Sequence, residues 1–99
     1  PHDRAECDRL AMESVMAAER AAGRVPLDVS AKKVGYDIES RDPLTGEPRF
    51  IEVKGRHEDG EVIIVTRNEI LTALNAGHRF WLALVRVSGG FAGQPQYLQ

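Results

Sequence analysis

The stretch from residue 80 to residue 87, Phe-Trp-Leu-Ala-Leu-Val-Arg-Val, constrains the fold of this chain more than any other. Its side chains are apolar almost without a break, whereas a strand with one face in water alternates apolar and polar residues. An unbroken apolar run is typical of a strand that is buried on both faces. The rest of the chain must therefore supply neighbouring strands and helices that cover the sheet.

Residues 3–22 have the pattern of a covering helix. They carry a single apolar stripe, and at about 1.5 Å per residue they predict a helix of about 30 Å, long enough to cross a small sheet. The stripe consists of Leu10, Ala11, Val15, Ala18 and Ala22.

The second helix is predicted by its first turn. Residues 66–69, Thr-Arg-Asn-Glu, have the form of a capping box, in which the Thr and Glu side chains satisfy backbone N–H groups at the helix start. We expect this helix to run through residue 76 and to bury a stripe formed by Ile70, Ala73 and Leu74.

The remaining segments predict strands and turns. Extended patterns cover residues 34–40, 49–55, 62–65 and 80–87, and a turn-rich segment from 42 to 48 joins the first two as an antiparallel hairpin. A short strand at 25–29 would be confined to a sheet edge by Pro26, and the glycine-rich residues from Ser88 onward predict a tail or terminal flap. The predicted fold class is α/β, a mixed central sheet flanked by helices in the order αβββαβ.

Length and composition limit the function classes. Ninety-nine residues form one domain, 1–99, and 13 Lys and Arg against 15 Asp and Glu give a net charge of −2, which lacks the basic footprint of a tight nucleic-acid binder. No apolar run approaches the length of a membrane span, so no membrane partner is expected. A single cysteine, Cys7, fits a reducing compartment, and we expect a cytoplasmic protein. The chain opens at Pro1 rather than Met, so we expect a piece of a larger protein.

Three charged residues stand out in the predicted hairpin. Glu52 and Lys54 share one face of the strand 49–55, and Asp37 lies on the strand that pairs with it. A solvated hairpin face with a weak ion pair is the ordinary explanation. The alternative is a Mg²⁺ site, because Mg²⁺ takes one or two carboxylates together with water and substrate phosphate. Asp37, Glu52 and the backbone carbonyl of Val53 would be its ligands, and Lys54 would orient or help deprotonate an attacking water.

Further residues are candidates for supporting roles. Glu19 lies at the margin of the apolar stripe of the first helix and adds another acid, and Gly55 permits a backbone or phosphate to approach closely. The candidate nucleic-acid contacts are the cationic and imidazole side chains that flank the motif strands. They are Lys33, Arg49, Arg56, His57 and Arg67, together with Lys32 and Arg41. Residues 31–60 hold six Lys and Arg against seven acids, so the segment is not a basic patch.

Asp37 followed by Glu52-Val53-Lys54 resembles the motif of the PD-(D/E)XK nuclease superfamily, whose αβββαβ core matches the predicted order. A longer set of segments resembles the NO VEIN carboxy-terminal domain family, a domain of unknown function, over about residues 9–87. These segments are residues 9–16 with Glu19, 35–40, 49–56 and 66–69. Members of that family often lie at the end of large helicase-like proteins, including proteins of bacterial restriction and defence systems.

The resemblance implies roles for individual residues. Asp37, Glu52 and Lys54 correspond to the nuclease triad, and Glu19 corresponds to the acid that several branches of the superfamily carry on the first helix. The implied cofactor is Mg²⁺, with Mn²⁺ as a substitute. The implied partners are DNA and a covalently linked helicase or other domain, and a homodimer stays open.

Three functions are carried forward. The first is a Mg²⁺-dependent endonuclease-like domain, a deoxyribonuclease that hydrolyses phosphodiester bonds in DNA. The second is a catalytically silent nucleic-acid-binding module of a helicase-like protein, since members of one fold can differ in activity. The third is a protein–protein docking domain, which should expose an apolar patch.

Overall fold

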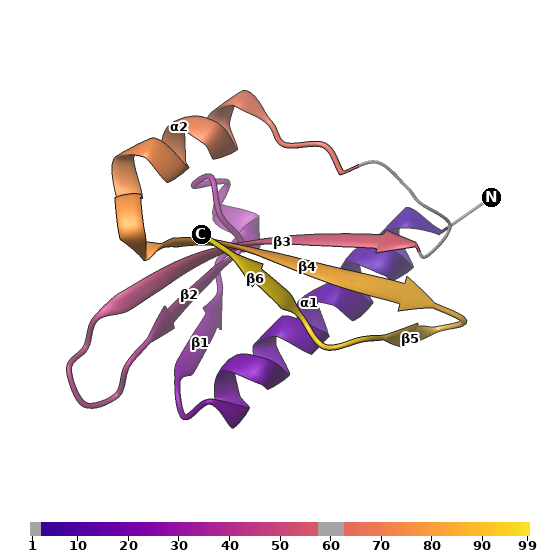
Figure 1. The fold of residues 1–99 in the computed structure, drawn as a ribbon, viewed down its shortest axis with the longest axis horizontal. Helices are drawn as coiled ribbons and strands as arrows, with labels where there is room; N and C mark the ends of the chain where they lie inside the picture. The colour runs from indigo at the N-terminus through magenta and orange to yellow at the C-terminus, as the bar shows by residue number, and fades with distance from the viewer. Residues whose placement is uncertain (1–2, 58–62) are drawn as a thin grey trace.

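The computed structural model describes residues 3–57 and 63–99, which form an α/β fold (Figure 1). The elements follow one another as α1 (Arg4–Ala21), β1 (Val25–Asp28), the 3₁₀ turn η1 (Ser30–Lys32), β2 (Ile38–Arg41), β3 (Pro48–His57), α2 (Arg67–Ala76), the 3₁₀ turn η2 (Gly77–Arg79), β4 (Phe80–Ser88), β5 (Phe91–Ala92) and β6 (Gln96–Leu98).

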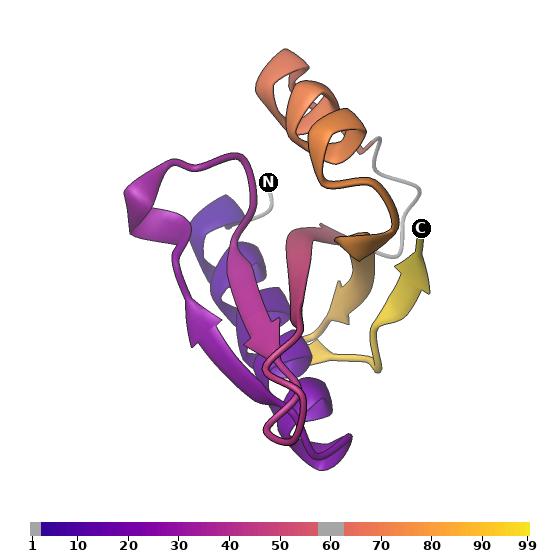
Figure 2. The same cartoon turned by 90° about the vertical axis from the view of Figure 1, so that its left-hand side faces the viewer.

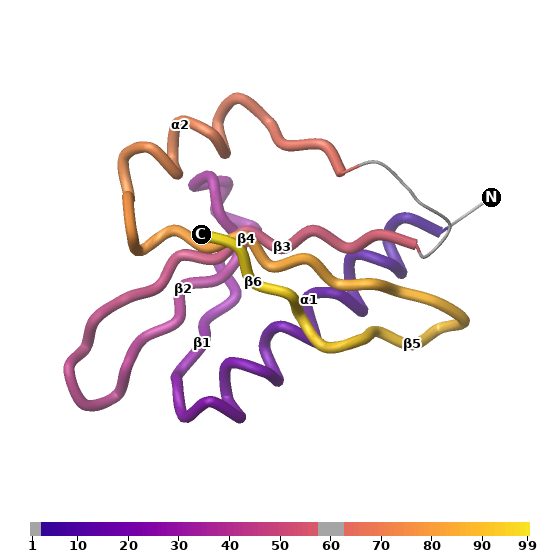
Figure 3. The backbone as a smooth tube through the Cα atoms, viewed as in Figure 1, coloured from indigo at the N-terminus to yellow at the C-terminus, as the bar shows by residue number. Residues whose placement is uncertain are grey.

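The strands form one mixed sheet. Its order is β1-β2-β3-β4-β5, and β6 pairs with β4 as well. Strands β1, β2 and β3 are antiparallel neighbours, whereas β3 and β4 run parallel. A parallel pair requires a crossover connection, and α2 provides it between β3 and β4 (Figure 3). The predicted mixed sheet with flanking helices is confirmed.

Helix α1 covers one face of this sheet (Figures 1 and 2). It starts at Asp3, whose side chain accepts a hydrogen bond from the backbone N–H of Glu6, as expected of an N-cap residue. Its buried residues are Cys7, Ala11, Val15 and Glu19, spaced at every fourth position. The buried stripe is therefore rotated from the predicted one: Ala11 and Val15 belong to it, whereas a cysteine and an acid complete it.

Strand β4 lies inside the sheet, between β3 on one side and β5 and β6 on the other. The predicted burial of both its faces is wrong: Ala83, Val85 and Val87 are buried, whereas Leu82 and Leu84 are half-buried and Arg86 is exposed on the other face.

The sheet is also completed differently from the prediction. Residues 63–65 are not a strand, and residue 62 lies outside the described ranges. The αβββαβ order is nevertheless present because β1, the edge strand with Pro26, supplies the first of the three strands that precede α2. The predicted tail is also corrected: β5 and β6 pair with β4 and cover an edge that would otherwise expose unpaired backbone groups.

Helix α2 departs furthest from its predicted packing. The capping box between Thr66 and Glu69 is confirmed, with both side chain-to-backbone hydrogen bonds present. No residue of α2 is buried, however, and Ile70 and Leu74 are 50% and 75% exposed. The predicted buried stripe is wrong because α2 lies on the opposite side of the sheet from α1 and makes few contacts with β4 (Figure 2).

Gly55 sets the distance between α1 and β3. A Cβ atom on Gly55 would lie 2.9 Å from the Cβ of Ala11 and 3.2 Å from the carbonyl oxygen of Cys7. Arg4 donates a hydrogen bond to the Gly55 carbonyl over 3.0 Å at the same contact. The close approach that this glycine permits is therefore the approach of the helix.

We expect Gly55→Ala to lower the free energy of unfolding by about 1–3 kcal/mol, because overpacking must push α1 away from β3. Urea denaturation followed by far-UV circular dichroism measures the change. Gly93→Ala is the matched control, because a Cβ there would meet only the Arg86 carbonyl oxygen at 3.7 Å. Equal stability of the Gly55 and Gly93 variants would contradict the packing role.

Candidate functional site

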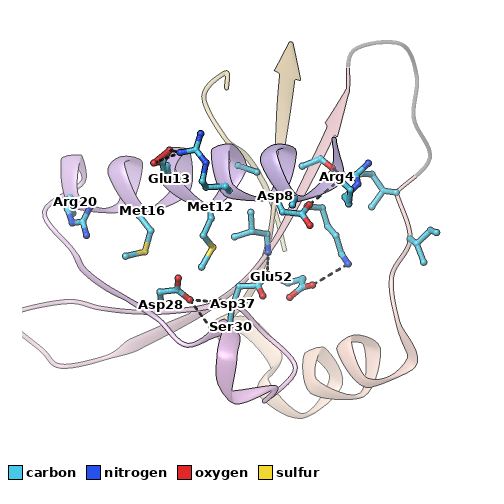
Figure 4. A pocket seen from close by; sticks show the side chains of 18 residues that line it. Arg4, Asp8, Met12, Glu13, Met16, Arg20, Asp28, Ser30, Asp37 and Glu52 are labelled. Atoms are coloured by element: carbon cyan, nitrogen blue, oxygen red, sulfur yellow. Dashed lines mark hydrogen bonds and ion pairs between the residues drawn. The ribbon is translucent and has the colours of Figure 1, made fainter. Parts of the chain in front are cut away.

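The site begins where β3 loses its neighbour β2. The pairing of these strands starts at Ile38 opposite Ile51, so the later residues of β3 have no partner in β2. Asp37 stands at this point: its backbone N–H donates to the Ile51 carbonyl over 2.9 Å, and its Oδ2 accepts a hydrogen bond of 2.8 Å from the Val53 N–H (Figure 4). The Asp37 carboxylate is thereby fixed against the edge of β3.

Glu52 and Lys54 project from the face of β3 that points away from α1, as the alternation of side chains along a strand predicts. Glu52 is 4% exposed, and its Oε2 lies 3.3 Å from the Lys54 Nζ. A second carboxylate reaches the same ammonium group from α2, because the Lys54 Nζ lies 3.0 Å from Oε1 of Glu69. Lys54 is thus held between an acid of the sheet and an acid of the helix.

Burial and the neighbouring carboxylates act strongly on Glu52. Burial, followed by the proximity of Glu69 and Asp37, raises the pKa of Glu52 to about 10. Burial alone would lower the pKa of Lys54, but its hydrogen bond to the Glu69 carboxylate and the nearby carboxyl groups outweigh this effect and raise it. Glu52 is therefore neutral and Lys54 charged at neutral pH when no cation is bound. A charged Lys54 donates hydrogen bonds and offsets negative charge, whereas it does not accept a proton from water.

The donor set is small. Within residues 3–57 and 63–99, no group of three or more His, Cys, Asp or Glu side chains is arranged to hold a metal ion. Asp37 and Glu52 supply two carboxylates, and the Val53 carbonyl leaves β3 on the same edge as the Val53 N–H that binds Asp37. Two carboxylates with a carbonyl fit Mg²⁺, which fills its other positions with water and substrate oxygens.

A groove of about 1170 Å³ gives access to this group. Helix α1 forms one wall with Met12, Met16 and Arg20, and Asp28 and Ser30 lie on the facing wall (Figure 4). The charges along the groove are mixed, so its lining is not a uniformly basic surface.

Glu19 lies outside this group, contrary to its expected role. Glu19 is 1% exposed, on the buried side of α1, and the Tyr97 hydroxyl donates a hydrogen bond of 2.8 Å to its Oε2. Arg24 and Arg49 lie 3.5 Å and 3.4 Å from its carboxylate oxygens. Burial, followed by the hydrogen bond to Glu19, raises the pKa of Tyr97. Arg49 alternates with Glu52 and Lys54 along β3, so the Glu19 cluster lies on the opposite face of the strand.

The expected nucleic-acid contacts are dispersed. Arg49 stacks on Trp81, 4.7 Å from the ring centroid, within the Glu19 cluster. By strand alternation His57 also projects on the α1 side of β3, whereas Arg56 shares the face of Lys54. Lys33 is exposed before β2, and Arg67 is exposed in the first turn of α2. The structure brings Asp37, Glu52 and Lys54 together and adds only Arg56 to their face of β3.

Glu69 is the residue that sequence reasoning underestimated. The capping box explains why the Glu69 carboxylate accepts a hydrogen bond of 2.9 Å from the Thr66 N–H, and this pattern is visible in the sequence. Its second role toward Lys54 depends on where α2 lies relative to β3. Hydrogen bonds with Glu52, Thr66 and Lys54 outweigh its burial and lower the pKa of Glu69 to about 2.

The family profile described as Protein NO VEIN, C-terminal matches residues 7–98. The chain belongs to this family. The resemblance drawn from the sequence motifs is thereby confirmed over nearly the whole domain. No curated protein and no solved structure matches the chain. Neither helix in the described parts of this NO VEIN C-terminal domain has the length and apolar composition of a membrane-spanning helix.

The first prediction from this site concerns pH. The native state keeps the Glu52 proton between the ordinary carboxyl pKa of 4.5 and its raised pKa of about 10, whereas the unfolded chain loses it. Without divalent cations, stability should therefore fall as pH rises through this window, by at most about 1.4 kcal/mol per pH unit from this group. Glu52→Gln should remove that slope. Urea denaturation in EDTA from about pH 5 to about pH 9 measures it. Parallel pH profiles of the wild type and Glu52→Gln would contradict the buried neutral carboxyl.

The second prediction concerns Glu19. Glu19→Gln should lower the free energy of unfolding by about 1–3 kcal/mol, because Arg24, Arg49 and Tyr97 then lose a buried charged partner. Thermal and urea unfolding measure the loss. The exposed Glu47→Gln is the control, since Glu47 contacts only Arg79, at 3.8 Å, among the ion pairs of the described residues. An unchanged stability would contradict the structural role of Glu19.

Proposed function

We propose that this domain is a Mg²⁺-dependent endonuclease that hydrolyses phosphodiester bonds in DNA. The observation that carries the proposal is the meeting of Asp37, the buried Glu52 and Lys54 at the free edge of β3. A solvated hairpin face would leave these side chains exposed, whereas Glu52 is buried beside Lys54.

Asp37, Glu52 and the Val53 carbonyl would hold the metal, with Mn²⁺ as a substitute for Mg²⁺. When bound, the ion would supply Lewis-acid polarisation of the phosphate and a lowered pKa for water. The buried carboxyl of Glu52 supports this assignment, because a nearby cation stabilises the charged form that burial disfavours.

The side chains around the proposed metal site would have separate roles. Lys54 would donate hydrogen bonds to the oxygens of the scissile phosphate and offset the charge that develops there. Glu69 would act as a positioning residue, because its carboxylate holds the Lys54 ammonium from the α2 side. The hydrogen bond from the Val53 N–H keeps the Asp37 carboxylate oriented toward the same edge.

The wider setting of the reaction follows from charge and family. A net charge of −2 gives little electrostatic attraction to DNA, so delivery to the substrate by a covalently linked helicase or another domain is part of the proposal. The resemblance to domains of restriction and defence systems supports a role in a bacterial protein of that kind.

Nicking of supercoiled plasmid in Mg²⁺ or Mn²⁺ tests the activity. We expect cleavage by the wild type and a loss of about 100-fold or more in Lys54→Ala, Glu52→Gln and Asp37→Asn, because each removes a group that binds the metal or the developing charge. Glu47→Gln, on the exposed hairpin turn, should retain activity. Circular dichroism verifies that each variant is folded.

A folded wild type that binds DNA but does not nick it in either metal would contradict the nuclease proposal. Activity that persists in Lys54→Ala and Glu52→Gln would place the reaction elsewhere or in a contaminant.

A second candidate function, protein docking, is favoured by the surface of α2. Ile70, Leu71 and Leu74 are exposed on a helix that buries none of its residues. An exposed apolar patch is typical of an interaction site. Substitution of Leu74 by Glu should leave plasmid nicking intact, so the two candidate functions are separable.

A further inference from the structure

Two arginines lie side by side beyond Lys54 on the same face of the sheet. In the parallel pairing of β3 and β4, Lys54 is opposite Leu84 and Arg56 is opposite Arg86. Neighbouring strands are about 4.8 Å apart, and residues two apart along a strand share a face. Arg56 and Arg86 are therefore adjacent to each other, and Arg56 lies two residues along β3 from Lys54. Lys54, Arg56 and Arg86 together form a cationic row on this face of the sheet.

This juxtaposition has no compensating acid in the described parts of the chain. Neither Arg56 nor Arg86 forms an ion pair or a side-chain hydrogen bond with any residue of 3–57 or 63–99. Among the described residues, Glu52 and Glu69 both lie within ion-pair distance of Lys54. Like charges opposite each other on neighbouring strands destabilise a sheet. Two unpartnered guanidinium groups at this position therefore point to an anionic ligand.

An exposed aromatic side chain continues the row. Arg86 and Ser88 share a face of β4, and Phe91 of β5 is the register partner of Ser88. The Phe91 side chain is 79% exposed, so it does not contribute to the hydrophobic core. A cationic row next to an exposed aromatic ring is the combination that binds single strands, through phosphate contacts and base stacking.

We propose that Arg56 and Arg86 bind backbone phosphates of a single-stranded nucleic acid next to Lys54, and that Phe91 stacks on one of its bases. Stacking on Phe91 requires an unpaired base, which is why the ligand is a single strand rather than an intact duplex. The inference rests on the proposed function in taking nucleic acid as the substrate, and it adds the strand state and the residues that hold the strand.

Binding without cleavage tests the inference. Fluorescence anisotropy in EDTA, with a labelled oligothymidine and a hairpin duplex of equal length, gives Kd as a function of salt. We expect the wild type to prefer the single strand. Arg56→Gln and Arg86→Gln should each reduce the slope of log K against log salt by about 0.7, and their combination by about 1.4. Phe91→Leu should weaken binding by about fivefold or more without changing the slope.

Two variants act as controls. Arg79→Gln removes an exposed arginine of η2, outside the row, and should bind like the wild type. Arg86→Glu places an acid opposite Arg56, so it should raise the midpoint of thermal unfolding while abolishing the preference for the single strand. A loss of binding in a more stable protein excludes misfolding as its cause.

The inference is overturned if the wild type binds neither probe, if the Arg56 and Arg86 variants keep the salt slope of the wild type, or if Arg79→Gln loses as much. A duplex preference overturns the assignment to single strands. The proposed nuclease activity fails separately, as absent nicking by a protein whose binding shows the predicted pattern.

Discussion

The unequal lengths of neighbouring strands are the constraint on which the site depends. β3 pairs with β4 over eight register positions from Phe50 to His57, whereas β2 pairs with β3 over only four. The last part of β3 is therefore supported on one edge and free on the other. Asp37 occupies this free edge with its carboxylate, and the backbone carbonyl of Val53 opens toward the same place. A longer β2 would have replaced both with ordinary strand pairing.

Side chains alternate along β3, so the residues that pack against α1 and the residues of the candidate site lie on opposite faces of the strand. Arg49, Ile51 and Gly55 face α1, where they contact the Glu19 cluster, the core and the helix backbone. Glu52, Lys54 and Arg56 face the other side, where Glu52 is buried and Lys54 and Arg56 are partly exposed. One strand thus carries a close helix contact on one face and, on the other, a carboxyl group whose pKa is strongly raised.

The position of α2 determines how Lys54 is held. The helix buries no side chain, yet its first turn delivers Glu69 to within 3.0 Å of Lys54. The capping box explains how this is achieved, because it fixes the Glu69 carboxylate at the helix start while leaving oxygen lone pairs for the lysine. The helix also contacts the chain before Asp37, because a Cβ atom on Gly35 would clash with the Thr72 hydroxyl oxygen. Helix α2 therefore contributes Glu69 to the site and Thr72 to the packing of the segment that precedes Asp37.

The sequence by itself determined the features that depend on local pattern. Helix α1, the capping box, the strand β4 and the shared face of Glu52 and Lys54 follow from periodicity and short-range hydrogen bonding, and the family is recognisable from its motifs. Only the tertiary structure decided that residues 25–28, with the weaker strand signal, join the sheet, whereas residues 63–65 of the stronger signal do not. It also decided that Glu19 binds Arg24, Arg49 and Tyr97 beneath α1 rather than approaching Asp37. Helix rotation, strand register and the distance of α2 from the sheet are set by contacts between residues far apart in the chain, and no local pattern encodes them.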